Sequence, residues 1–421
     1  GDFESLGRLT VSVDKSHFAE TYEDSILNLN ELTPHQRDKL AECVDVLRGN
    51  TSGKAAVHIR APAGAGKTFL ALHFMQSILQ DRDAKDRSEM ARVLFIACNP
   101  PLVIWVAKWL AKRFSTSTKR NRVLSRLHVI SAPLSAGPHT IAIKNNMIKR
   151  NVVNKESWDG STLAQYDLVV VDEAHHIFRN EVMRELVAPV VTAANRCMLL
   201  SDVSQSLLAG IEFPPGMHQV DLTQVVRSSK RIVAASLQFQ LSEGKEENLS
   251  RCAHESEGPP LKSFLFDIKD KQERFESYAM HTVRAMRHVT DEFDGLNLHD
   301  RLAIIVPDAQ FAEQLRPLLA RHLHAEFVDT RQFMLVTAAD ASAACSFKKM
   351  SQGQSGGAEW IVFDEMEQLD GLERLICVCV GLDAAVGLEE SGTLEVRSML
   401  YRAMTRAHMM VLVVNEFIAG G

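Results

Sequence analysis

The feature that most constrains this chain is a glycine-rich loop with an apolar segment on each side. Residues 61–68 read Ala-Pro-Ala-Gly-Ala-Gly-Lys-Thr, after an apolar run at 55–59 and before another at 69–75. This order predicts a strand, a loop and a helix, the arrangement that holds a triphosphate through backbone N–H groups and a lysine. Ala61 stands where the first glycine of such loops is usual. We predict that the cradle consists of Gly64, Ala65, Gly66, Lys67 and Thr68.

A second motif supplies two carboxylates. Residues 168–171 read Leu-Val-Val-Val and predict a strand buried on both faces, with Asp172 and Glu173 directly after it. Parallel strands end at one edge of a sheet, so both carboxylates should reach the phosphate loop. We predict that Asp172 and the Thr68 hydroxyl hold magnesium and that Glu173 accepts a proton from an attacking water.

Two glutamines are further candidates, and each has an alternative. Gln36 lies on a helix predicted to begin at residue 34, and its amide suits the N6/N7 edge of adenine, although a solvent-facing position is equally compatible. Gln205 follows an apolar run at residues 197–200. It could contact the γ-phosphate or its water, or it could be solvated beside a helix cap.

Length and composition favour a globular protein of two domains in a reducing compartment. At 421 residues the chain is too long for one ordinary core, and 46% hydrophobic with 24% charged residues is typical of a globular protein. The longest apolar run, residues 375–382, is too short to cross a bilayer, and the first residues lack the pattern of a signal peptide. The seven cysteines include no C-x-x-C pair. We therefore expect no membrane association and an intracellular location in the nucleus or cytoplasm, for a chain that could be a fragment of a longer protein.

Charge is unevenly distributed along the chain. Net charge is −6, yet residues 90–155 hold twelve basic residues and no Asp or Glu. A positive region on an acidic molecule favours nucleic-acid binding, although a solvent-exposed face without a ligand would show the same charge pattern. Trp105 and Trp109 could stack on bases, but their i,i+4 spacing favours packing in a core. The predicted contacts to nucleic acid are Lys112, Arg113, Lys119, Arg120, Arg122 and Asn99.

The motifs together resemble the ordered motifs of superfamily 1 helicases. Besides Gln36, the phosphate loop and Asp172–Glu173, they comprise Ser201-Asp202-Val203-Ser204-Gln205, Gln224-Val225-Val226-Arg227-Ser228, Asp370-Gly371-Leu372-Glu373 and Tyr401-Arg402-Ala403-Met404-Thr405-Arg406. They span residues 32–407, nearly the whole chain. The compact build, without room for large inserted subdomains, looks more like the helicase-like domains of the Schlafen and DUF2075 groups. Asp370 departs from the family pattern, which usually has a lysine there.

The resemblance implies an α/β fold of two RecA-like, doubly wound parallel-sheet domains with ATP in the cleft between them. It implies that Arg227 and Arg406 reach from the second domain to the γ-phosphate and that Glu373 lies near the ribose. We expect an N-terminal extension at residues 1–30, a first domain at 31–212 with a basic insertion at about 108–160, and a second domain at 213–421.

These features support two functional hypotheses. The first is an ATP- and magnesium-dependent translocase or helicase on single-stranded nucleic acid, with DNA and RNA equally open. The second is an ATP-dependent conformational switch or signalling module that acts on a fused or associated effector domain without unwinding. A phosphotransferase acting on a small molecule is a distant third, because no acceptor site is apparent. Nucleic-acid stimulation of ATP hydrolysis separates the first two.

Overall fold

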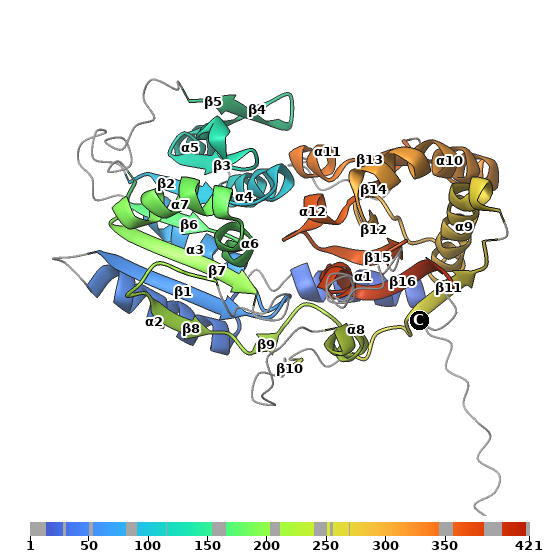
Figure 1. Cartoon of the computed structure of the whole chain (residues 1–421), viewed down its shortest axis with the longest axis horizontal. Coiled ribbons are helices and arrows are strands. Elements are labelled where there is room, and N and C mark those ends of the chain that lie inside the picture. The colour runs from blue at the N-terminus through green and yellow to red at the C-terminus, as the bar shows by residue number, and fades with distance from the viewer. Residues whose placement is uncertain are drawn as a thin grey trace, which may run out of the picture.

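Two β-sheets, each packed against helices, lie side by side in the computed structural model (Figure 1). The structure describes residues 14–27, 31–49, 54–80, 91–114, 116–153, 166–202, 211–239, 251–252, 256–268, 270–344, 357–382 and 398–417. Both sheets are built mainly from parallel strands joined through helices. This confirms the predicted class of two RecA-like α/β domains.

The first sheet has the strand order β5-β4-β3-β2-β6-β7-β1-β8. Its strands are β1 (Ala55–Ala61), β2 (Val93–Ile96), β3 (Leu127–Ile130), β4 (His139–Lys144), β5 (Met147–Val152), β6 (Leu168–Val171), β7 (Arg196–Asp202) and β8 (His218–Asp221). All neighbours are parallel except at one edge, where β4 and β5 form an antiparallel hairpin next to β3. This hairpin lies at the sheet edge where the sequence predicts an insertion.

Helices cover both faces of the first sheet. They are α2 (Pro34–Gly49), α3 (Lys67–Gln80), α4 (Pro100–Lys112), α5 (Ser117–Leu124), α6 (Ala174–Arg179) and α7 (Glu181–Ala193). Successive residues of a strand point to opposite faces, and β2 shows the result. Val93 and Phe95 join the core beneath α2 to α5, whereas Leu94 and Ile96 join the core beneath α6 and α7. The strands are buried on both sides, which is why their sequences are continuously apolar.

The second sheet is wholly parallel, in the order β11-β16-β15-β12-β14-β13. Its strands are β11 (Lys262–Phe266), β12 (Leu302–Val306), β13 (Phe333–Val336), β14 (Glu359–Glu365), β15 (Arg374–Val380) and β16 (Ala407–Glu416). The helices that follow the first sheet in the chain are α8 (Lys230–Ser236), α9 (Arg274–Glu292), α10 (Ala309–Phe327), α11 (Ala338–Ala343) and α12 (Met366–Leu369), and residues 398–404 are also helical. The short strands β9 (Gln224–Val225) and β10 (Arg251–Cys252) pair in the connection between the sheets.

Two segments cross the domain boundaries expected from the sequence. The helix α1 (Lys15–Leu27) precedes the first domain but packs on the second, where the Tyr22 hydroxyl donates to the His408 carbonyl at 2.9 Å. Arg301 of the second domain donates to the Glu23 carboxylate at 2.8 Å and so holds the same helix against this domain. β8 lies beyond residue 212 and still pairs with β1 in the first sheet. Long-range pairing, rather than position in the chain, therefore decides where these segments belong.

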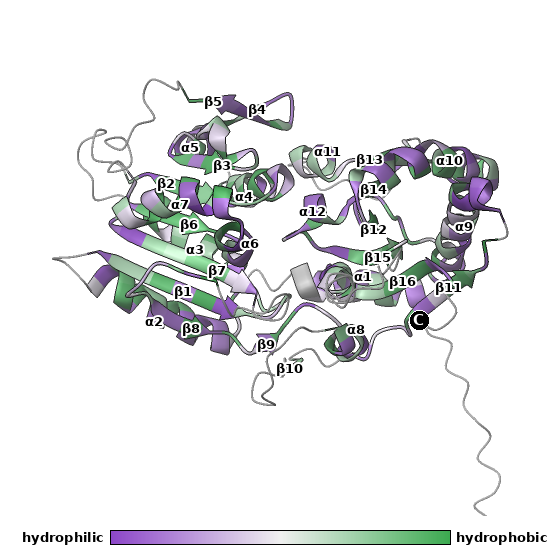
Figure 2. Cartoon of the chain, in the orientation of Figure 1, coloured by the Kyte–Doolittle hydropathy of each residue, from purple (hydrophilic) through white to green (hydrophobic). Residues whose placement is uncertain are grey.

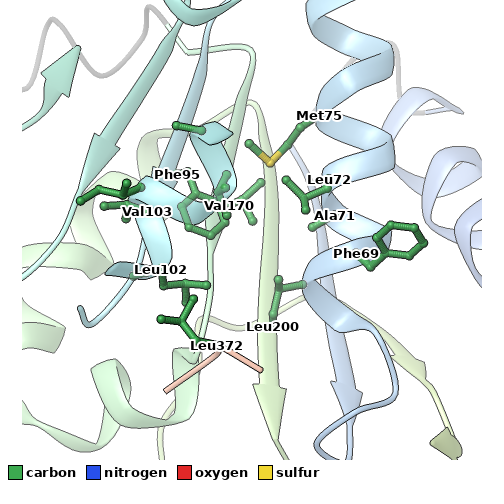
Figure 3. Packing of buried hydrophobic residues seen from close by; sticks show 14 of the residues in the cluster. Phe69, Ala71, Leu72, Met75, Phe95, Leu102, Val103, Val170, Leu200 and Leu372 are labelled. Atoms are coloured by element: carbon green, nitrogen blue, oxygen red, sulfur yellow. The ribbon is translucent and has the colours of Figure 1, made fainter. Parts of the chain in front are cut away.

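One apolar core continues from the first domain into the second. The cluster beneath α2 to α5 includes Leu372 of the second domain, which lies beside Leu102 of α4 (Figure 3). The fit is close, since a Cβ added to Gly371 would lie 2.7 Å from a Leu102 methyl carbon. The two domains are thus packed together along α4.

Hydropathy follows the layers. The inner strands of both sheets are hydrophobic, whereas the β4–β5 hairpin is largely hydrophilic (Figure 2). Within the described parts of the chain, no helix combines the length and apolar character needed to cross a membrane.

Candidate nucleotide site between the two domains

The phosphate loop has the predicted strand, loop and helix order. β1 ends at Ala61 and α3 begins at Lys67. Gly64 and Gly66 have φ angles of +72° and +89°, values that side chains rarely tolerate. A Cβ added to Gly66 would also lie 2.5 Å from Nε2 of Gln36. The loop is therefore restricted to glycine by both conformation and space.

Gln36 braces this loop. Its side-chain Nε2 donates to the Ala65 carbonyl at 2.9 Å, and its Oε1 accepts from the Thr33 N–H at 3.1 Å. The side chain is 3% exposed. Both halves of the amide are engaged within the protein, so in this conformation Gln36 does not offer the donor and acceptor pair that the sequence analysis assigned to adenine.

Lys67 and Thr68 lie where the motif predicts. The Lys67 ammonium is 3.9 Å from the Asp202 carboxylate at the end of β7 and donates to the Ala61 carbonyl at 3.4 Å. The Thr68 hydroxyl donates to Asp172 Oδ2 at 2.7 Å, which joins the start of α3 to the end of β6. Gln205, also predicted near this position, lies outside the described residues.

The donors at this point suit magnesium. A hydroxyl and a carboxylate side by side are hard oxygen ligands, and a carboxylate of this kind holds Mg²⁺ in phosphate-loop proteins. Asp172 is fully buried, and burial together with the neighbouring Glu173 carboxylate raises its pKa to about 6. The residues present therefore fit a divalent cation, whose charge would offset the proximity of the two carboxylates.

Glu173 has an unusual backbone and an unsatisfied side chain. Its φ of 49° and ψ of 42° place a residue other than glycine in the left-handed region, which costs roughly 1–3 kcal/mol. Its Oε2 is buried and accepts no hydrogen bond from the described residues, although His175 Nδ1 is 3.6 Å away. Burial raises the pKa of Glu173, but Lys67 and Arg406 outweigh it and hold that pKa below its usual value. Glu173 is thus an ionised carboxylate with an acceptor oxygen available for a ligand.

Arg406 of the second domain interacts electrostatically with this carboxylate. It is 5% exposed, and its Nε donates to the Arg402 carbonyl at 3.0 Å. Burial lowers the pKa of Arg406, but the carboxylates of Glu173 and Asp370 raise it by a larger amount. The net pKa therefore lies above its ordinary value. The charged side chains of the two domains therefore meet where a nucleotide would bind.

Arg227, the other predicted arginine, is engaged elsewhere in this conformation. Its Nη1 donates to Glu373 Oε2 at 2.8 Å, and its guanidinium lies over the Phe69 ring at 5.1 Å. Burial raises the pKa of Glu373, but Arg227 and His408 lower it to a net value of about 2. The Glu373 carboxylate is therefore bound to an arginine, which differs from its expected place at the ribose.

Two further residues of this site had no role predicted from the sequence. Arg402 pairs through two nitrogens with the Asp370 carboxylate, the position that departs from the helicase pattern. His175 accepts from the Asp202 N–H at 3.2 Å and links the ends of β6 and β7. Arg402 stands four residues before Arg406, and this helical spacing was the available signal.

Asn99 is not a nucleic-acid contact in this structure. Its Oδ1 caps α4 by accepting from the Leu102 N–H at 2.9 Å. Its Nδ2 donates to the carbonyls of Glu367 at 3.1 Å and Asp370 at 2.9 Å in the second domain. The residue is 3% exposed, so the prediction is corrected: Asn99 joins the two domains.

The predicted basic contacts differ in how accessible they are. Lys112, Lys119 and Arg122 are exposed. Arg120 donates to the Phe114 carbonyl at 3.3 Å, and Arg113 lies over the Trp109 ring at 4.2 Å. Trp105, Trp109 and Phe114 pack against the core, which confirms the core alternative for the two tryptophans. The exposed cations of α5 and the end of α4 therefore remain as the accessible basic surface.

A pocket beside the phosphate loop is lined by both domains. Its lining combines Ala63 of the loop with Val225, Ser228, Tyr401 and Thr405 from the second half of the chain. The Val226 N–H donates to the Gly64 carbonyl at 3.1 Å and closes one end of the loop. Residues from both halves of the chain therefore adjoin the phosphate loop.

Comparison with known proteins gives the same fold. Residues 29–201, which include the phosphate loop and the Asp172–Glu173 pair, match the family described as Type III restriction enzyme, res subunit. Comparison with curated protein sequences finds no match. Together, the fold and the arrangement of the phosphate loop define an α/β protein of two RecA-like domains.

Two solved structures illustrate the likeness. The DEAD-box helicase Mss116 bound to ssRNA and UDP-BeF shares 15% identity at a TM-score of 0.50, over 96% of this chain and 75% of that one. Mss116p, lacking its NTE and C-tail and bound to ssRNA and AMP-PNP, shares 15% identity at a TM-score of 0.49, over 96% of this chain and 73% of that one. At this identity the likeness concerns the fold.

Proposed function

We propose that this chain is an ATPase of the superfamily 1 helicase type that uses ATP hydrolysis to move along single-stranded nucleic acid. The observation that carries the proposal is the Glu173 carboxylate. It is buried, ionised and unsatisfied at Oε2, with Lys67 on its own domain and Arg406 on the other. A carboxylate held in this way is suited to accept a proton from water.

The residues of the site divide the work of phosphoryl transfer. The N–H groups of Gly64, Ala65 and Gly66 and the Lys67 ammonium would bind the phosphates, because a glycine-rich loop at a helix N-terminus favours anions. Glu173 would orient and deprotonate water. Arg406 would stabilise the charge that develops on the transferred phosphoryl group, a contribution of about 10³ to 10⁵ in rate for such arginines.

Magnesium would be held by Thr68 and Asp172, whose oxygens are already adjacent. When bound, the ion neutralises phosphate charge and aligns the reacting group.

Arg227 and Glu373 are assigned a supporting role at the domain interface, since they bind each other in the conformation described.

Single-stranded nucleic acid is the proposed polymer. The exposed cations Lys112, Lys119 and Arg122 lie on α4 and α5 at one side of the first domain, near the hydrophilic β4–β5 hairpin (Figure 1). Phosphate neutralisation by such residues supplies most of the affinity for a polymer without sequence preference. The DEAD-box neighbours were solved with ssRNA, which is consistent with this substrate class.

The test of this function is the ATPase rate with and without single strands. We expect purified protein to hydrolyse ATP slowly alone and at least about tenfold faster with single-stranded DNA or RNA, because a translocase couples hydrolysis to its polymer. Turnover is compared with that of Glu173→Gln to exclude contaminating activity. An ATP turnover that neither polymer changes would contradict a motor. An ATP turnover no greater than that of Glu173→Gln would contradict an ATPase.

A charge reversal tests the proposed binding surface. We expect Lys119→Glu with Arg122→Glu to weaken single-strand binding about tenfold or more and to reduce its salt dependence, with basal ATP turnover retained. Arg120 is left unchanged because it donates to a backbone carbonyl. Lys271→Glu, in the short 3-10 helix that precedes α9, with Arg284→Glu on α9 makes the same charge change in the second domain, on the far side of the molecule (Figure 1). If both double variants bind single strands equally well, α5 is not part of the nucleic-acid interface.

An ATP-dependent switch is a second candidate, favoured by one observation. The loop after β2, where Asn99 was expected to meet nucleic acid, is buried against the second domain. α4 also packs on α11 and α12. A switch would open this contact in response to ATP to present a surface to another protein or effector domain. Turnover insensitive to nucleic acid would favour it.

A further inference from the structure

A continuous set of hydrogen bonds leads from the first domain to Arg406. It begins at Asn99, which caps α4 with its Oδ1 and donates through Nδ2 to the carbonyl of Asp370 at 2.9 Å. It continues through the Asp370 carboxylate, which binds Arg402 at Nε (3.1 Å) and also at Nη2. It ends at the Arg402 carbonyl, which accepts from Arg406 Nε at 3.0 Å.

The Asp370–Arg402 pair is buried, and stability alone does not explain it. The two side chains are 5% and 14% exposed. Taking both charges out of water costs about as much as their attraction returns, and apolar residues of similar volume often serve as well. What a pair bound through two nitrogens does provide is geometry, because the planar guanidinium and carboxylate fix each other's orientation.

Packing restricts movement at the same point. Gly371, next to Asp370, approaches Leu102 so closely that a Cβ would lie 2.7 Å away. Leu102 is also the residue whose N–H is capped by Asn99. A displacement of the α4 N-terminus would therefore move Asp370 directly, and through Arg402 would move Arg406.

We propose that Asp370 and Arg402 are positioning residues that hold Arg406 against the nucleotide and couple its position to the N-terminus of α4. This inference rests on the proposed function, in which Arg406 contacts the phosphoryl group. Opening of the domains at Asn99 withdraws the arginine, and closure restores it. The aspartate at position 370, unusual for the helicase pattern, is the residue that makes the connection.

The test compares kinetic constants of three conservative variants. Asp370→Asn keeps the shape but removes the charge, Arg402→Lys keeps the charge but removes the second donor, and Asn99→Ser keeps a helix cap but cannot reach the second domain. We expect each to lower kcat for ATP, by about tenfold to a hundredfold for the first two, with KM within about twofold of wild type. Glu359→Gln is the matched control, because Glu359 binds Arg331 at 2.7 Å in the second domain, outside this set of hydrogen bonds.

A binding measurement makes the test independent of turnover. The affinity for ADP with aluminium fluoride, a mimic of the transferring phosphoryl group, should fall in the three variants while affinity for ADP alone is unchanged. Wild-type affinity for the mimic, or an equal loss of affinity for ADP, would overturn the inference. If wild-type protein shows no turnover above Glu173→Gln, the proposed function fails, and the affinity for the mimic still decides whether Asp370 and Arg402 position Arg406.

Discussion

Replacing Arg406 by alanine is expected to lower kcat for ATP by about 10³-fold or more while ATP binding changes little. The guanidinium is buried in the second domain and interacts electrostatically with Glu173 of the first domain. A charge in that place acts mainly on the transition state, where negative charge spreads over the phosphoryl oxygens. The phosphate loop, which provides ground-state binding, lies wholly on the first domain.

Steady-state kinetics and binding of a fluorescent ATP analogue check this prediction. Arg316→Ala is the control, because Arg316 is also an arginine of the second domain that donates to backbone carbonyls, at 2.8 Å to Phe363. A reduction of kcat smaller than about tenfold would show that Arg406 does not contact the reacting phosphoryl group.

Glu173→Gln is expected to lower kcat by about 10²- to 10⁴-fold, the usual contribution of a general base. Glutamine has nearly the same shape but cannot take a proton at neutral pH. The variant should still bind ATP, because Lys67, Thr68 and the loop are unchanged, and it should retain bound ATP in place of ADP.

Rapid-quench analysis of the bound nucleotide distinguishes these states. Glu185→Gln, which changes an exposed carboxylate on α7 of the same domain, should hydrolyse ATP like the wild type. Retention of more than about a tenth of wild-type turnover by Glu173→Gln would assign the proton transfer to another group.

Local patterns were enough to predict how the first domain arranges the phosphate loop and the strand that ends before Asp172. The strand, loop and helix order around Lys67 and the apolar strand before Asp172 are each specified by about ten consecutive residues, because backbone conformation and burial are local properties here. The conformation of the loop follows from Gly64 and Gly66, whose positive φ angles the sequence pattern anticipates.

Contacts between residues that are distant in the chain could not be predicted in the same way. Asn99 and Asp370 are 271 positions apart, and the asparagine amide suits a nucleic acid as well as a backbone carbonyl. Gln36 was ambiguous for the same reason, since an amide pairs equally well with a base or with the Ala65 carbonyl. The docking of α1 on the second domain depends on Tyr22 and His408, which are 386 positions apart.

The face of α4 on which the aromatic residues lie was predictable in principle from their spacing. Trp109 and Arg113 are four positions apart on consecutive turns, which places the guanidinium over the ring. Arg113, a predicted nucleic-acid contact, therefore lies against a tryptophan whose spacing already favoured core packing. Only the cations that extend beyond the packed face remain exposed.

We propose that one nucleotide is bound jointly by the phosphate loop and by Arg406 of the second domain. A crystal structure with ADP, magnesium and aluminium fluoride tests it most directly. We expect the fluoride group between the Lys67 ammonium and the Arg406 guanidinium, with Glu173 facing it. Nucleotide bound to the first domain alone, with Arg406 turned away, would contradict joint binding by the two domains.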